Sequence, residues 1–557
     1  MVRKILGFLY KETKSLNQAA FLLGLFSFLS QILGLLRDRL LAHIFGAGQA
    51  LDIYTAAFRI PDFIFVTAAS IVSLSVLIPF IINEESKGKE SLRRFVDNIF
   101  SFFAIFIVAI SVLAFFLMPF AAKILFKGFN PSELAETIFL SRVLLLSPII
   151  LGLSNLLGSI TQAYGRFTVY ALAPVLYNAG IVLGVLVFAT KLGVLGVALG
   201  VIIGALFHVF IQVPSVMSLG LFPRLRFIDW KMIKNVVTIS LPRTLTLSMS
   251  QLSAIFLISL ASLMSAGSIS VLYFSINLMT APLSLIGVSY SLAAFPTLSR
   301  NFKERNFEAF KNQMRATARF IIFWSLPLTA LIVILRAQIV RVLLGSGQFG
   351  WEDTRLVAAA LALFIISSLS QSLLLLFMRG FYSAGFTRKP FFINLVSTIV
   401  LFFLAWSSVK LFYASEFIRH WTATVLRVQN LPDTAVLVLP LAFSLATILN
   451  SVILWAAFER EFPGFSRGIA RTLFDSLGAS FIIGVVAYLA LKIFGPLFNT
   501  ATLPGIFAQG FLSGITALVA GVAVLLALKN KELSEIWDAV RQKFVKTRVI
   551  ATDPEIV

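Results

Sequence analysis

The chain has 557 residues, of which 59% are hydrophobic and only 13% are charged, and its mean hydropathy is +0.94. A water-soluble protein of this length carries roughly a quarter of its residues as charged side chains, so a soluble enzyme, a disordered tail and a collagen-like rod are excluded. A net charge of +21 would indicate nucleic-acid binding in a soluble protein. In a membrane protein, the distribution of Lys and Arg among the loops accounts for such an excess first. Composition therefore predicts an integral membrane protein with no nucleic-acid partner.

The absence of cysteine excludes disulfides and thiolate metal sites. The three histidines, His43, His208 and His420, lie far apart and show no metal-ligand spacing. We expect neither a metal nor a cofactor. The chain begins with a basic segment, residues 1–16, and the apolar run after it exceeds a signal peptide's apolar region and lacks a small-residue cleavage site, so we expect it to be retained.

About 20 apolar residues are needed to cross a bilayer core, and breaks at charged residues, Gly and Pro divide the chain into fourteen candidate spans. They cover residues 17–45, 50–82, 95–121, 138–163, 168–190, 194–219, 234–264, 267–298, 316–337, 354–383, 389–413, 434–458, 470–495 and 504–528. An even number of spans puts both termini on one side. With that side as the cytoplasm, basic residues in its segments outnumber those in the opposite loops by about three to one. This orientation also places the basic tail, residues 530–557, in the cytoplasm.

Several short motifs recur about 220 residues apart in the same order, which indicates an internal duplication. The pairs are Ser30-Gln31 with Ser250-Gln251, Ala47-Gly48 with Ala266-Gly267, Pro61 and Pro79 with Pro282 and Pro296, Gly165 with Gly385, and Pro174 and Asn178 with Pro390 and Asn394. The repeat predicts an N-lobe at 17–220, a C-lobe at 230–460, and two extra spans at 466–529. Repeats of six spans keep their orientation, so we expect a substrate site between the lobes near the midplane.

Polar residues follow one face of the second span, within an arc of about 80° at 100° per residue. They are Asp52, Thr55, Arg59, Asp62, Ser70 and Ser73. The eighth span has a similar uncharged face with Ser270, Tyr273, Asn277, Thr280, Ser284 and Ser291, and the seventh contributes Arg243. Such faces fit the walls of a hydrated cavity or hydroxyl bonding between helices. Ionisable residues within a span favour the cavity because they are costly in lipid.

The triplet Arg37-Asp38-Arg39 lies near the outer end of the first span. Consecutive helical residues point about 100° apart, so Arg37 and Arg39 face different places. Lining a cavity and reaching out to headgroups both fit Arg37.

No enzyme motif is present: the sequence contains no P-loop, no Gly-x-Ser-x-Gly and no metal spacing. A membrane glycosyltransferase needs a large outward loop with carboxylates. The longest outward segment, roughly 414–433, carries only Glu416 and Asp433. We therefore expect a protein that is not an enzyme.

Motifs along the first twelve spans resemble those of the MurJ/MviN family of lipid II flippases. The opening signature consists of Leu33-Gly34, Arg37-Asp38, Ile44-Phe45-Gly46-Ala47-Gly48, Asp52, Ala57-Phe58 and Pro61. Later matches are Arg166-Phe167, Ala173-Pro174, Asn178, Pro296, Leu298-Ser299, Gly347, Phe349 and Gly380-Phe381-Tyr382-Ser383.

The resemblance implies a fold of the MOP superfamily, with two six-helix lobes around a cationic cavity and spans 13 and 14 forming a groove for a polyprenyl tail. It also implies transport of an undecaprenyl-diphosphate-linked disaccharide-pentapeptide by alternating access in the bacterial cytoplasmic membrane, which we expect a monomer to perform. The expected substrate-binding residues are Arg37, Asp52, Arg59, Asp62, Arg243 and Asn277. The expected structural motif residues are Gly46, Gly48, Pro61, Pro174, Asn178, Pro390 and Asn394.

The chain departs from the family pattern at several cavity positions. Gln31 and Asn277 stand where the family usually has arginines, Phe65-Val66 replaces a basic pair, and Ser70 replaces a glutamate. A flippase for another polyprenyl-linked saccharide and a multidrug exporter of the same superfamily are therefore alternatives, as is a non-transporting scaffold or enzyme of envelope assembly.

Overall fold

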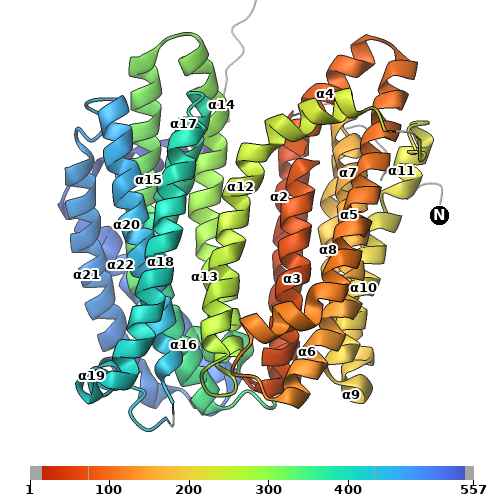
Figure 1. Ribbon diagram of the computed structural model, residues 1–557. Helices are drawn as coiled ribbons and strands as arrows, with labels where there is room; N and C mark the ends of the chain where they lie inside the picture. The colour runs from red at the N-terminus through yellow and green to blue at the C-terminus, as the bar shows by residue number, and fades with distance from the viewer. Residues whose placement is uncertain (1–15, 73, 227, 432, 546–557) are drawn as a thin grey trace, which may run out of the picture. The chain divides into compact units, whose positions relative to one another are not determined.

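The computed structural model describes residues 16–72, 74–226, 228–431 and 433–545 (Figure 1). Across these ranges the regular structure consists of helices without strands, which confirms the predicted all-α class. A helix satisfies its own backbone hydrogen bonds, as a chain surrounded by hydrocarbon requires.

The helices follow one another through short turns. Their bounds are α2 Leu16–Phe45, α3 Gln49–Ile71, α4 Leu74–Ser86, α5 Lys89–Leu125, α6 Pro131–Leu144, α7 Leu146–Ala163, α8 Phe167–Val187, α9 Ala189–Leu192, α10 Val194–Phe210, α11 Val213–Ser218, α12 Trp230–Ala261, α13 Ser268–Leu283, the π-helix η1 Ser284–Val288, α14 Ser289–Lys303, α15 Phe307–Leu344, α16 Trp351–Ile365, α17 Ser368–Ser383, α18 Arg388–Ala414, α19 Glu416–Leu426, η2 Ala435–Leu437, α20 Val438–Glu461, α21 Ile469–Phe494, η3 Gly495–Leu497, α22 Leu503–Ala527 and α23 Lys531–Val545.

Within the described ranges, 11 helices are long and apolar enough to cross a membrane, or up to 12 if the bent pair α16 and α17 forms one span. These helices correspond to the third through fourteenth predicted spans. The first two predicted spans are also helical, as α2 and as α3 followed by α4, but they are outside this set. Both carry charged residues, Arg37 to Arg39 in α2 and Asp52, Arg59 and Asp62 in α3.

The chain packs into two compact units. The first comprises Met1–Leu278, Leu343–Ala360 and Thr387–Ala446, and the second comprises Met279–Val342, Leu361–Phe386 and Thr447–Val557. In the first unit, α3, α4, α5 and α7 enclose an apolar core with buried aromatic residues such as Phe95 and Phe103. The second unit contains smaller apolar clusters that join α15 to α21 and α22.

The turns after α7 and α17 are built alike, which supports the predicted duplication. Gly165 and Gly385 both adopt positive φ angles, +67° and +78°. In each turn, the residue after the glycine donates a backbone hydrogen bond five residues back, from Arg166 to Thr161 and from Phe386 to Phe381. Glycine ends a helix in this left-handed conformation without a Cβ penalty.

Glycines let α8 and α10 approach until their backbones touch. Gly180 and Gly184 of α8 face Gly200 and Gly204 of α10, and a Cβ added to Gly184 would lie 2.2 Å from the Cα of Gly200. Small residues four apart are typical of such close crossings between membrane helices, because packing replaces the hydrophobic effect there.

We predict that Gly184→Ala destabilises the protein by about 1–3 kcal/mol, the usual range for overpacking. Gly478→Ala is the matched control, since no heavy atom lies within 4 Å of its added Cβ. Thermal unfolding of the purified variants in detergent measures both effects. An unchanged melting temperature for Gly184→Ala would contradict the close packing of α8 and α10.

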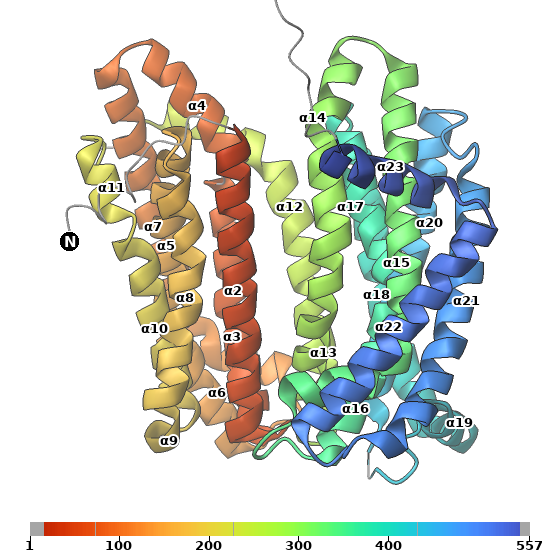
Figure 2. The same ribbon diagram turned by 180° about the vertical axis from the view of Figure 1, so that it is seen from behind.

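Within the second unit, a buried ion pair attaches the C-terminal helix α23 to α15. Figure 2 shows the ribbon of α23 in this unit. Glu532 accepts hydrogen bonds from Arg319 of α15 at 2.6 Å and from Thr472 of α21 at 2.6 Å. Leu533 and Ile536 extend the contact by packing near Phe323 in an apolar cluster. Burial raises the pKa of Glu532. The hydrogen bonds that Glu532 accepts, including those from Thr472 and Arg319, lower the pKa by more than burial raises it, so the net shift is downward.

We predict that Glu532→Gln releases α23, because removal of one partner from a buried ion pair costs about 3–5 kcal/mol. Hydrogen exchange and limited proteolysis of α23 measure the release. Glu535→Gln is the control, since Glu535 is exposed and lies 3.9 Å from Lys531. In the wild type, the contribution of Glu532 is fully present above the ordinary Glu pKa of about 4.3 and is lost as the pH falls through its lowered pKa. Equal protection of α23 in both variants would refute this attachment.

Candidate functional site

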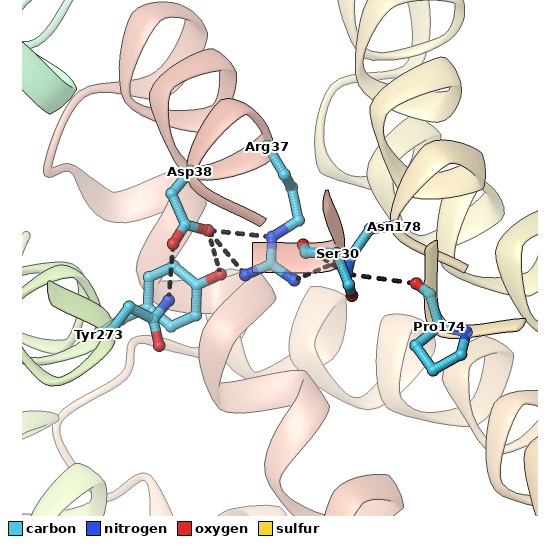
Figure 3. Close-up of polar contacts among 7 residues, drawn as sticks. Ser30, Arg37, Asp38, Pro174, Asn178 and Tyr273 are labelled. Carbon is cyan, nitrogen blue, oxygen red and sulfur yellow. Dashed lines mark hydrogen bonds and ion pairs between the residues drawn. The ribbon is translucent and has the colours of Figure 1, made fainter. Parts of the chain in front are cut away.

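A polar network centred on Asp38 connects α2 with α13 (Figure 3). Asp38 is only 4% exposed. Its carboxylate pairs with Arg37 at 2.8 Å, and it accepts hydrogen bonds from the Tyr273 hydroxyl and the Asn277 amide, both at 3.0 Å. Each of these three contacts brings a donor group to an oxygen of Asp38.

The Arg37 guanidinium extends the network toward α8. It donates to the Asn178 amide oxygen at 3.4 Å, and the Asn178 amide nitrogen donates to the Ser30 hydroxyl at 3.0 Å. Ser30 also lines a pocket between α2 and α8, together with Leu23, Phe26, Ser27, Gln31, Tyr170, Ala171 and Pro174. Arg37 is thus oriented from both sides and lies close to a hollow lined by polar and apolar groups.

Arg37 and Arg39, which are two residues apart on α2, point in different directions, as predicted. Arg39 donates to the backbone carbonyl of Leu343 at 3.4 Å, away from the Asp38 network. The side chain of Arg37 is 21% exposed and is engaged by Asp38 and Asn178. Its contacts favour lining a site over reaching for headgroups.

Arg59 of α3 and Arg37 of α2 share neighbouring side chains. Tyr54 and Tyr273 lie near both arginines, and Asp62 lies near Arg59 and Tyr177. The Nε atom of Arg59 is buried and has no hydrogen-bond partner among the described residues. A buried guanidinium group with an unused donor has capacity for an anionic ligand.

Asp52, at the start of α3, caps the N-terminus of α13. It accepts hydrogen bonds from the backbone N–H groups of Gly267 and Ser270 at 2.6 and 2.7 Å, and from the Ser270 hydroxyl at 2.6 Å. A carboxylate is stabilised there by the free N–H groups and the helix dipole. The contacts tie Asp52 to α13 and leave it 4% exposed.

The glycines beside Asp52 permit this contact. Gly46 has a φ of +63° and ends α2, and Gly48 precedes α3 as its N-cap residue. Gly267 has a φ of +93°, and a Cβ there would lie 2.1 Å from the carbonyl oxygen of Ala47. The two turns pair closely because each contains glycine where a side chain would strain or clash.

The polar face of α3 beyond Pro61 bonds to α12. Ser70 donates to the Thr244 hydroxyl at 2.6 Å, and the Thr67 and Ser248 hydroxyls lie 3.2 Å apart. This part of the predicted cavity wall therefore has the alternative role of hydroxyl bonding between helices. Ser73 is outside the described residues.

The remaining predicted positions are spread over other elements. Arg243 is in α12, but its side chain is outside the described residues. Pro61 is inside α3, Pro174 is inside α8, and Pro390 and Asn394 are in the first turns of α18. The structure thus brings Arg37, Arg59, Asp62 and Asn277 into one region, and adds Asn178, which the sequence indicated only as a structural motif.

Sequence reasoning missed Asp38, Tyr54 and Tyr177 as members of this region. A helical-wheel argument points Asp38 about 100° away from Arg37, but both side chains are long enough to meet. Tyr54 shares a face with neither Asp52 nor Arg59, so only the packing of α2, α3, α8 and α13 identifies it. Across the part of the chain that the structure describes, no group of three His, Cys, Asp or Glu could hold a metal ion.

The family model for the lipid II flippase MurJ matches residues 41–508. A probable lipid II flippase MurJ of Bdellovibrio bacteriovorus is 27% identical over 493 residues, which cover 86% of this chain and 90% of the relative. A probable lipid II flippase MurJ of Buchnera aphidicola subsp. Schizaphis graminum is 28% identical over 381 residues, which cover 67% and 74% of the two chains.

Solved structures share the fold. The lipid II flippase MurJ in an inward closed conformation aligns with a TM-score of 0.72 at 20% identity, covering 94% of this chain and all of that one. An inward-facing multidrug resistance transporter of the MATE family and MOP superfamily aligns with a TM-score of 0.62 at 15% identity, covering 79% and 96%. This chain thus shares its fold with both transporters, and it belongs to the MurJ family of lipid II flippases.

Proposed function

We propose that this protein moves lipid II, a polyprenyl-diphosphate-linked peptidoglycan precursor, from the inner to the outer leaflet of the bacterial cytoplasmic membrane by alternating access. Membership of the lipid II flippase family supports this function. We also propose that it works as a monomer, without enzymatic activity, and with both termini in the cytoplasm, as the bias of basic residues indicates. The two lobes at 17–220 and 230–460, and the spans at 466–529, remain part of this proposal.

The observation that carries the proposal is the pair of arginines, Arg37 of α2 and Arg59 of α3, which belong to the first two predicted spans and lie near the same tyrosines. A diphosphate offers oxygens that two guanidinium groups can bind through paired, charge-assisted hydrogen bonds. Ionisable groups within membrane spans mark a substrate path by default.

We assign different roles to the individual residues. Arg59 supplies the available cation, while Asp38 and Asn178 orient Arg37. Asn277 donates a hydrogen bond to Asp38, which in turn orients Arg37, so Asn277 is a positioning residue. Asp62 balances Arg59, Arg243 is a further cation for the head group, and Asp52 joins α3 to α13.

A multidrug exporter is the second candidate because the MATE-family transporter shares the fold. An exporter of organic cations would favour carboxylates free to meet the substrate. Here Asp38 and Asp52 are occupied by hydrogen-bond donors from the protein itself. The arginines therefore favour an anionic substrate.

Rescue of a bacterial strain depleted of its own lipid II flippase tests the proposed function. We expect expression of this chain to restore growth and outward transport of lipid II. Failure to rescue, with the protein correctly inserted at a normal level, would reject lipid II as the substrate.

We predict that Arg59→Gln abolishes rescue while insertion remains intact, because the variant keeps a polar side chain but loses the charge that binds the diphosphate. Arg59→Lys should retain partial activity, since a point charge replaces a bidentate group. Arg419→Gln is the control, because Arg419 is an exposed residue on α19, outside the site. Wild-type rescue by Arg59→Gln would contradict the assigned role.

A further inference from the structure

The segment between α11 and α12 is held in an extended form against α5. The backbone N–H of Arg224 donates to Asp97 at 2.9 Å, and that of Arg226 donates to the Ser101 hydroxyl at 2.8 Å. The Arg226 side chain also pairs with Asp97 at 3.1 Å. Alternate residues of an extended chain point the same way, so two buried side chains on α5 hold one edge of this segment.

A third residue of α5 fixes the end of the segment. The Asn98 side chain accepts from the N–H of Asp229 at 2.9 Å and donates to the carbonyl of the same residue at 3.3 Å. Asp229 then caps α12 through the N–H groups of Lys231 and Met232. Asp97, Asn98 and Ser101, which we name the α5 clamp, are at most 5% exposed.

The clamped segment exposes large apolar side chains between cations. Phe222, Leu225 and Trp230 are 44%, 70% and 67% exposed. The exposed cations are Arg224, Arg226, Lys231 and Lys234. Of these, only Arg226 has an ion-pair partner within the described ranges. We name residues 222–226 and 228–234 the basic linker.

The length of α12 places the basic linker at the membrane surface. With 32 residues, α12 is about 48 Å long at 1.5 Å per residue, whereas the hydrocarbon core is about 30 Å thick. The stretch Thr244–Ala261 is by itself apolar enough to cross a membrane, and Lys231 and Lys234 lie in the first turns of α12, well before it. Figure 1 shows these turns at the same end of the first unit as α4 and the start of α5. A tryptophan beside lysines is typical of the headgroup region.

We propose that the basic linker is a docking surface for anionic phospholipid headgroups of the cytoplasmic leaflet, held in position by the α5 clamp. The leaflet on the positive-inside face carries the negative surface potential that attracts juxtamembrane Lys and Arg. The exposed apolar side chains insert beside the headgroups while the cations meet the phosphates. This surface is separate from the proposed transport site. Through it, the lipid composition would act on the protein at the junction between the two sequence repeats.

The experiment uses the full-length protein in nanodiscs of phosphatidylcholine alone or with phosphatidylglycerol. Because the chain has no cysteine, Leu225→Cys accepts a single environment-sensitive fluorophore. We expect the label to be quenched by brominated lipid, and brominated phosphatidylglycerol to quench more than brominated phosphatidylcholine at equal fractions. The preference should weaken with salt, since exposed charges are screened over about 8 Å at physiological ionic strength.

The triple variant Arg224→Gln, Lys231→Gln, Lys234→Gln should lose this preference. At an anionic membrane surface, the loss of three cations corresponds to a decrease of up to roughly 100-fold in the affinity for anionic lipid relative to neutral lipid. The matched control removes three exposed cations elsewhere, Arg300→Gln, Lys303→Gln and Arg305→Gln, and should keep the preference. Asp97→Asn should reduce it although every cation of the linker remains.

Three outcomes would overturn the proposal. Equal quenching by both lipids in the wild type would reject a charged lipid surface. An unchanged preference in the linker triple variant would place the lipid selectivity elsewhere. Absence of quenching in both kinds of nanodisc would show that the linker faces water or protein.

Discussion

No water is available in a bilayer core to satisfy a buried polar group, and the arrangement of this chain's charged side chains follows from that constraint. Asp38 is surrounded by an arginine, a tyrosine and an asparagine, and Asp52 by two backbone N–H groups and a serine. Arg59 departs from this pattern through its unused Nε donor. A buried donor of this kind is able to bind an acceptor that a substrate supplies.

Hydropathy predicted the helices well because it depends on local sequence: each predicted span from the third to the fourteenth overlaps a helix or bent pair able to cross the membrane. The glycine turns at Gly165 and Gly385 were also predictable, since their repeat reflects local backbone geometry. The hydrogen-bond and ion-pair partners of the charged side chains were not predictable from the sequence. Asp38 meets Asn277 239 residues further on, and no helical wheel contains that information.

The polar face of α3 illustrates why one pattern does not have one meaning. A helix of 23 residues is about 35 Å long, so one face passes several neighbours. Asp52 meets the start of α13, Arg59 lies among tyrosines, and Ser70 meets α12. The single polar face that the sequence indicated therefore contacts different elements along its length.

The buried ion pair between Glu532 and Arg319 has a consequence for biosynthesis. The two residues are 213 positions apart, and a chain is made from its N-terminus. Arg319 is therefore synthesised long before its partner, and its compensating charge arrives only after α21 and α22 have been completed. A chain that terminates before α23 leaves this arginine without its carboxylate, and a buried charge without its partner is strongly destabilising.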